Sequence, residues 1–79
     1  MTERPSPALT LDVKGKYCPI PVIEAAKACK RLDPGAVILI LATDPGVKTD
    51  FPDWCRSMKH ELLGIEEVGK LYKVWIRRG

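Results

Sequence analysis

The segment LTLDVKGKYCPIPVIEAAKACKRL, residues 9–32, decides how this chain folds. Residues 9–13 alternate apolar and polar side chains, which predicts a short, half-buried strand. Residues 22–32 carry apolar side chains at helical spacing, which predicts a helix. The motif CPIP, residues 18–21, stands between the two. Proline suits the first turn of a helix, because its missing N–H would have no intrahelical partner there.

Cys18 is therefore expected at the N-terminus of this helix, close to its N-cap position. Unpaired N–H groups give that end partial positive charge, and cysteine pKa values there can fall from about 8.5 to roughly 3.5–7.5. Pro19 and Pro21 remove two of these N–H groups, which reduces the effect. We predict that Cys18 is an accessible thiol that acts as a nucleophile or carries sulfur. The alternative is a small residue packed at a helix start.

The rest of the chain predicts a strand, a helix and two further strands. These elements are expected at residues 36–42, 50–63, 65–68 and 71–78, with a hairpin turn at 69–70 and two Asp-Pro-Gly turns of one design at 33–35 and 44–46. The order is then strand, helix, strand, helix, strand, strand. We predict an α/β fold of the α+β two-layer sandwich type, with a mixed four-stranded sheet and both helices on one face.

The periodicity also predicts which side chains face the core. The expected inward-facing residues are Val22, Ile23, Ala26, Cys29 and Leu32 on the first helix, Phe51, Cys55, Met58 and Leu62 on the second, and Tyr72, Val74 and Ile76 on the last strand. Cys29 and Cys55 are thus expected to be packing residues. Lys73, Trp75 and Arg77 would lie on the open sheet face, as chance exposure or as a partner surface. His60, expected late on the second helix, is interpreted as a surface or structural residue.

Connectivity places the candidate site at one edge of the sheet. The first two strands flank a helix and should run parallel, so both end at the same edge. The Cys18 loop and the turn at residues 44–46 should therefore lie side by side. This makes Asp44, Lys48 and Asp50 candidate neighbours of Cys18, with Asp44 first a turn residue and Asp50 first a helix cap.

Composition limits the class of protein. With 79 residues the chain forms one domain, taken as residues 9–79 after a flexible tail at 1–8. It holds three cysteines without a Cys-x-x-Cys pair and one histidine, so we predict no metal site, no disulfide framework and no cofactor. The net charge of +3 is spread along the chain, so direct nucleic-acid binding is not favoured. A signal-peptide core and a membrane-spanning segment are not expected, and we predict a cytoplasmic protein.

From about Leu9 to Arg78 the chain resembles the TusA-like (SirA-like) family of sulfur-carrier proteins. The resemblance is carried by Asp12, Gly15, the CPIP motif, Pro34-Gly35, Asp44-Pro45 and residues 50–55, 60–62 and 72–77. It implies that Cys18 accepts sulfane sulfur as a persulfide and passes it to another protein. Donors of the implied kind are cysteine desulfurases or rhodanese-like proteins, and acceptors are DsrE-type or other proteins. The family's roles are tRNA thiolation, molybdenum-cofactor assembly and sulfur trafficking in sulfur oxidation.

The residues themselves are compatible with this chemistry. A persulfide relay needs a reachable thiolate, which a loop at a helix tip offers. Pro19, Pro21 and Gly15 would frame the thiol, while Lys14, Lys16 and Lys48 would stabilise the persulfide anion and steer an acidic partner. The chain would be a sulfurtransferase without turnover of its own. The alternatives are a regulatory or adaptor module that binds a protein or RNA without sulfur chemistry, and a redox thiol protein.

Overall fold

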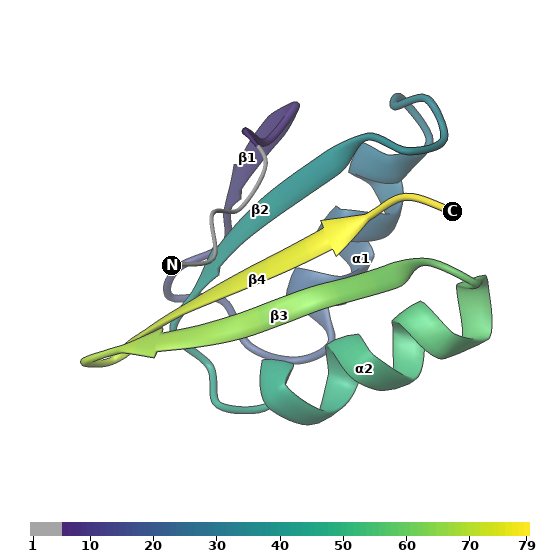
Figure 1. Ribbon diagram of the computed structural model, residues 1–79. Helices are drawn as coiled ribbons and strands as arrows, with labels where there is room; N and C mark the ends of the chain where they lie inside the picture. Colours follow the sequence, from purple (N-terminus) through teal and green to yellow (C-terminus); the bar gives the residue numbers. More distant parts are fainter. Residues whose placement is uncertain (1–5) are drawn as a thin grey trace.

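The computed structural model describes residues 6–79, so most of the expected tail at 1–8 lies outside the described residues. The elements run in the predicted order (Figure 1). They are β1 (Leu9–Asp12), α1 (Ile20–Cys29), β2 (Val37–Ala42), α2 (Val47–Met58), β3 (Glu61–Val68) and β4 (Leu71–Arg77).

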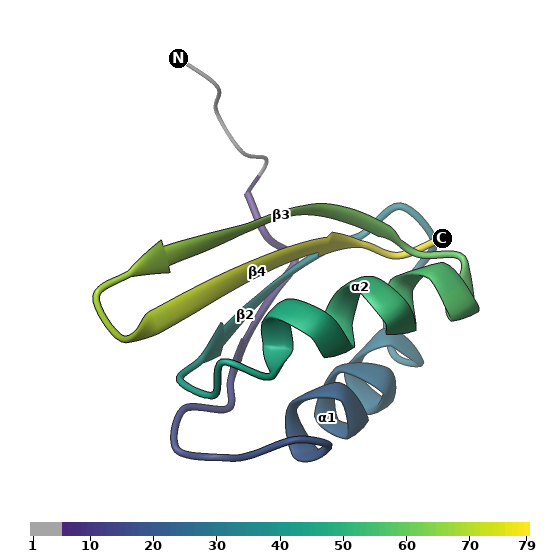
Figure 2. The ribbon, with the colours of Figure 1, turned by 90° about the horizontal axis from the view of Figure 1, so that it is seen from below.

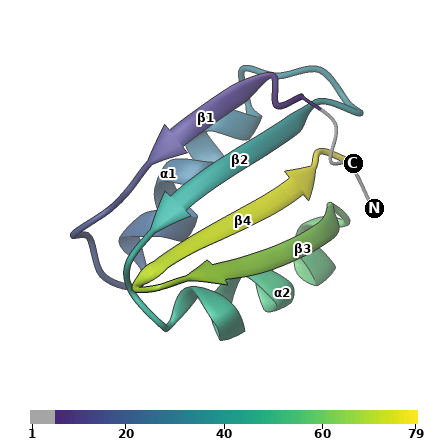
Figure 3. The same cartoon turned by 60° about the vertical axis from the view of Figure 1, so that its left-hand side comes forward.

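The four strands form one mixed sheet in the order β1-β2-β4-β3, which Figure 3 shows from its open side. β1 and β2 are parallel, whereas β4 is antiparallel to both β2 and β3. Both helices lie on one face of the sheet (Figure 2), which confirms the two-layer sandwich. Neither helix among residues 6–79 has the length and apolar character needed to cross a membrane.

The core lies between the helices and the two central strands. Ile38 and Ile40 of β2 and Val74 and Ile76 of β4 are fully buried, and Phe51 of α2 packs with them. The predicted alternation of β4 is confirmed, because Tyr72, Val74 and Ile76 are the buried residues of that strand. The apolar run of β2 is central, as expected, although only one of its faces is fully buried.

The first helix differs from its expected position. It begins two residues early, at Ile20, and ends at Cys29 rather than at residue 32. Its buried residues are Pro21, Ala25, Ala28 and Cys29, whereas Ile23 is 42% exposed. Of the predicted stripe, Cys29 lies in the core and Val22 and Leu32 pack against it, whereas Ile23 faces solvent. The small alanines face inward instead, where they allow the helix to approach its neighbours closely.

The second helix also begins early and ends early. It spans Val47–Met58, so Asp50 lies in its first turn instead of capping it, and Pro52 lies inside it. Gly46 has φ −58° and leads into this helix, whereas Gly35 has φ +90°. The two Asp-Pro-Gly segments therefore do not share one design.

Residues 60–63 were expected to continue this helix and instead join the sheet. Lys59 adopts a left-handed conformation (φ 61°) that ends α2, and His60 lies between α2 and β3. Leu62 pairs with Ile76, and Gly64 lies within β3 opposite Trp75 instead of ending the helix. Pairing along β4 satisfies the backbone of this segment, and tertiary pairing overrides local helical periodicity.

Candidate functional site

Cys18 lies in the loop between β1 and α1 and is exposed, whereas Cys29 and Cys55 are buried. The N-cap of α1 is Pro19, which places Cys18 one residue before the cap. The Cys18–Pro19 peptide bond is cis. Ile20 donates its N–H to the carbonyl of Tyr17 at 2.8 Å, which closes a tight turn around the cysteine. The backbone of this turn presents Cys18 to solvent.

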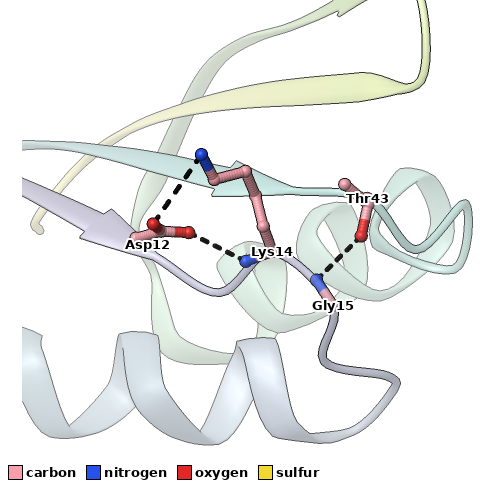
Figure 4. Close-up of polar contacts among 4 residues, drawn as sticks. All are labelled: Asp12, Lys14, Gly15 and Thr43. Atoms are coloured by element: carbon pink, nitrogen blue, oxygen red, sulfur yellow. Dashed lines mark hydrogen bonds and ion pairs between the residues drawn. The ribbon is translucent and has the colours of Figure 1, made fainter.

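Two residues that follow β2 hold this loop in place. The N–H of Gly15 donates to Oγ1 of Thr43 at 2.9 Å (Figure 4), and the N–H of Cys18 donates to Oδ2 of Asp44 at 2.8 Å. The other oxygen of Asp44, Oδ1, accepts the N–H of Gly46 at 3.2 Å. The prediction that the Cys18 loop and the Asp44 loop lie side by side is confirmed, and Thr43 is a contact that sequence reasoning missed.

The start of the loop is stabilised by a local turn. Oδ1 of Asp12 accepts the N–H of Lys14 at 3.0 Å, and Nζ of Lys14 lies 3.8 Å from Oδ2 of the same carboxylate (Figure 4). Gly15 follows with φ +80°, and nothing lies within 4 Å of the place where a Cβ would be. Glycine is therefore needed here for its backbone angle, not for close approach.

The charges that act on the Cys18 thiol are acidic. The pKa of Cys18 is raised, first by a hydrogen bond between its side chain and Asp50, then by desolvation and by the negative charges of Asp50 and Asp44. The expected lowering of this pKa is therefore wrong. The free thiol is the favoured form at neutral pH, and Asp44 and Asp50 are the predicted neighbours that the fold brings to Cys18.

The lysines of the predicted surround are directed elsewhere. Lys14 pairs with Asp12, and Nζ of Lys48 lies 3.6 Å from Oε1 of Glu67 and 5.8 Å from the centre of the Tyr72 ring. Lys16 is exposed and forms no side-chain ion pair with another residue of the described chain, 6–79. Lys16 is thus the member of this set that remains available to a partner.

Three exposed apolar side chains lie next to Cys18 in the sequence or on the first turn of α1. Tyr17 is 73% exposed, and Ile20 and Ile23, one turn apart on α1, are 40% and 42% exposed. We call these three residues the apolar collar. Exposed apolar groups next to a reactive residue are typical of surfaces that contact another protein.

The remaining candidates have structural roles. Burial raises the pKa of Cys29 and raises the pKa of Cys55 to about 11. Both thiols are therefore inert packing groups, as predicted.

His60 follows the C-terminal end of α2, whereas Cys18 lies near the N-terminal end of that helix. The 12 residues of α2 separate the two ends by about 18 Å. Its ring lies 4.8 Å from that of Trp54, and its Nδ1 accepts the N–H of Gly79 at 3.0 Å. On the open sheet face, Trp75 donates to Glu66 at 2.8 Å.

Comparison with known proteins agrees with this architecture. The crystal structure of a SirA-like protein from Desulfitobacterium hafniense superposes with a TM-score of 0.78 at 29% sequence identity, over 90% of this chain and 97% of that one. Residues 9–78 match the family described as sulfurtransferase TusA. The match covers nearly the whole chain and supports a role in carrying sulfur within a relay of partner proteins. This chain therefore belongs to the TusA sulfurtransferase family.

Proposed function

We propose that this protein accepts sulfane sulfur as a persulfide on Cys18 and delivers it to a partner protein. The observation that carries the proposal is the position of this thiol. Cys18 is the exposed cysteine of a sulfurtransferase-family chain, and its backbone N–H is fixed by Asp44 at 2.8 Å. Its exposure lets a second cysteine approach the sulfur directly, as thiol–disulfide exchange requires.

Each step of the relay is an exchange at sulfur. The Cys18 thiolate attacks the outer sulfur of a donor persulfide, the donor's S–S bond breaks, and the donor cysteine leaves as a thiolate. Cys18 then holds the added sulfur as Cys18–S–SH. In the second step an acceptor thiolate attacks that outer sulfur, and Cys18 leaves as a thiolate and takes up a proton. Sulfur is moved twice without net oxidation or reduction.

The surrounding residues would frame the thiol and receive the partners. Pro19 and Pro21 fix the backbone on the helix side of Cys18, and Gly15 permits the turn on the other side. The apolar collar supplies a contact surface around the sulfur, and Lys16 adds positive charge to it. Suitable donors are cysteine desulfurases or rhodanese-like proteins, and suitable acceptors are DsrE-type or other relay proteins. The collar would then be the surface that both classes contact in turn.

The cellular role follows from the same chemistry. Cys18 must be a free thiol before it takes up sulfur, and cysteines stay reduced in the cytoplasm, so we place the protein there. The sulfur would serve tRNA thiolation, molybdenum-cofactor assembly or sulfur-oxidation trafficking. Each of these roles needs the same loaded Cys18 and differs in the acceptor protein.

Intact mass spectrometry tests the proposal. The protein is incubated with a persulfide-loaded cysteine desulfurase or with polysulfide, with and without reductant. Wild type should gain one sulfur atom, reductant should remove it, and Cys18→Ser should gain none. Cys29→Ala is the matched control, because it removes a buried cysteine and should load like wild type. An equal adduct on Cys18→Ser, or no adduct on wild type, would reject Cys18 as the carrier and favour an adaptor that binds without sulfur chemistry.

A further inference from the structure

A hollow lies at the end of the molecule opposite the Cys18 loop. Its volume of about 460 Å³ is within the range of small-molecule sites. The C-terminal end of α2 lies on one side of it, and the start of β3 and the end of β4 lie on the other (Figure 1). Cys18 precedes α1 and bonds to the loop before α2, so this hollow is separate from the sulfur site.

Positive side chains dominate the lining of the hollow. Arg56 lies in the last turn of α2 and Lys59 is its C-cap, while Arg77 ends β4 and Arg78 follows it. We call these four residues the basic cluster. Among the described residues that line the hollow, only Glu61 has an acidic side chain. The fold thus gathers cations from two distant segments of the chain around one concave surface.

Two cations of the basic cluster have acidic neighbours. Nη1 of Arg77 lies 2.9 Å from Oε1 of Glu61, and Nη1 of Arg56 lies 3.7 Å from Oδ1 of Asp53. All four of these side chains are exposed to solvent. Ion pairs between exposed side chains contribute little to stability, so both arginines can exchange them for a contact with a more highly charged anion.

The other two cations have no acidic side chain as a partner. Neither Lys59 nor Arg78 forms an ion pair with a side chain among residues 6–79. Arg78 donates from Nε to the carbonyl of Cys29 at 2.8 Å and from Nη1 to the main-chain oxygen of Gly79 at 3.2 Å. These bonds fix the guanidinium and leave further N–H groups to donate. A carboxylate at Gly79 would offset one of the two charges but not both.

Lys59 occupies a backbone position at which glycine is usual. It ends α2 with φ 61°, in the left-handed region. Helices commonly end on a glycine in this conformation, because a Cβ is disfavoured there. A lysine gives up backbone stability and adds a charge beside the hollow. Cations also suit the C-terminal end of a helix, but Arg56 meets that need from the last turn without this strain.

A second hollow, of about 120 Å³, adjoins the first, because His60 and Arg78 line both. Trp54 and Met58 give it an apolar wall. Nδ1 of His60 accepts the N–H of Gly79 at 3.0 Å, so the neutral ring carries its proton on Nε2, which can donate. An anionic group in the larger hollow would therefore have apolar surface next to it.

We propose that the basic cluster binds the phosphate group of a small molecule whose apolar or aromatic body lies against Trp54 and Met58. Phosphate suits the cluster, because guanidinium groups bind its oxygens in pairs and lysine supplies a point charge. Surfaces that bind RNA carry a continuous stripe of cations, whereas Glu61 and Asp53 interrupt this cluster. The concave shape and the apolar wall favour a small molecule. The inference does not depend on sulfur transfer at Cys18.

An NMR titration of the ¹⁵N-labelled chain tests the site. Inorganic phosphate, phenyl phosphate, phenol and a uridine RNA oligonucleotide are added separately at constant ionic strength, with chloride as the reference anion. Inorganic phosphate and phenyl phosphate should cause saturable shifts of the N–H signals of Lys59, His60 and Arg78. Phenyl phosphate should also shift the indole N–H of Trp54 and bind roughly threefold or more tightly than inorganic phosphate, because its ring is partly buried. The signal of Cys18 should not move.

Substitutions at Lys59 separate binding from folding. Lys59→Gln and Lys59→Gly both remove the charge, and each should weaken the binding of phenyl phosphate roughly three- to tenfold. Lys70→Gln is the matched control, because it removes a lysine from the turn between β3 and β4, at the opposite end of the sheet. It should bind like wild type. Lys59→Gly relaxes the left-handed position and should not lower the melting temperature, so its weaker binding would not come from unfolding.

Each contrary outcome identifies what fails. Shifts that do not saturate, that match those in chloride, or that lie outside the hollow would overturn the site, and so would equal binding by wild type and Lys59→Gly. Shifts with the RNA oligonucleotide but not with phenyl phosphate would overturn it in favour of a nucleic-acid surface. Equal affinity for inorganic phosphate and phenyl phosphate would overturn the placement of the apolar body. Cys18→Ser should bind phenyl phosphate like wild type, so a failure of sulfur loading leaves this test intact.

Discussion

Replacing Asp44 with alanine should loosen the Cys18 loop and destabilise the fold. The half-buried carboxylate accepts two backbone N–H groups, from Cys18 at 2.8 Å and from Gly46 at 3.2 Å. A hydrogen bond to a charged group contributes about 1.5–3 kcal/mol. Water can replace part of these two hydrogen bonds in the exposed loop, so we expect Asp44→Ala to lower the free energy of unfolding by about 2 kcal/mol in total.

That loss is large for a chain of this size. A domain of 79 residues is typically stable by roughly 4–12 kcal/mol, so Asp44→Ala should lower its melting temperature by about 8–16 °C. Asp44→Asn keeps one acceptor oxygen and should lose about half as much. Urea unfolding followed by circular dichroism gives the free energy of each variant.

The matched control is Asp33→Ala in the other Asp-Pro-Gly segment. The Asp33 side chain makes no hydrogen bond or ion pair with another residue in the described part of the chain. This change alters the net charge equally and should cost under about 0.5 kcal/mol. Equal losses in Asp44→Ala and Asp33→Ala would refute the reasoning, because the effect would then come from the turn sequence and not from the bridge to Cys18.

Three further predictions concern packing, ionisation and docking. Gly46→Ala places a Cβ 3.1 Å from Oδ2 of Asp44 and should cost roughly 1 kcal/mol in thermal unfolding, and a gain in stability would contradict the tight fit. Burial raises the pKa of Cys55 from 9.0 to about 11, so the fold favours the protonated thiol. The free energy of unfolding should therefore be constant below pH 9 and should fall by up to about 2–3 kcal/mol as the pH rises to 11, measured by urea titration at each pH. Cys55→Ala should lose less stability over the same range, and an equal loss in both proteins would refute the role of Cys55. Ile23→Glu should slow loading by a donor protein on the order of tenfold while loading by polysulfide is unchanged, and Met58→Glu, 57% exposed at the far end of α2, should load normally. Equal slowing by both substitutions would refute the docking role of the collar.

Strand patterns proved the most predictable part of the sequence. The alternation along β4 correctly identified its buried and open faces, because strand periodicity is set by the backbone alone. The side-by-side placement of the Cys18 and Asp44 loops followed from the parallel pairing of β1 and β2. Both inferences used rules that hold for any sheet and needed no knowledge of individual side-chain contacts.

Helix boundaries and single contacts were less accessible. Residues 60–63 fit a helical period as well as a strand, and their pairing with β4 decided the outcome. The hydroxyl of Thr43 bonds to Gly15, 28 residues earlier, and no local pattern announces such a contact. Only the position of Thr43 could have indicated this contact, because it directly follows β2 at the edge of the sheet where Cys18 was expected.

The pKa of Cys18 shows how two electrostatic effects compete at a helix start. The partial positive charge of a helix N-terminus resides on free N–H groups. At α1, Pro19 and Pro21 have no N–H, and the N–H of Ile20 is already bonded to Tyr17, so little of that charge faces the thiol. Asp50 and Asp44 on the neighbouring elements raise the pKa of the thiol, so the acidic effect prevails. The pKa of Cys18 therefore depends on acidic residues in the loop after β2 and in α2, and Asp50→Asn is the substitution that should lower it.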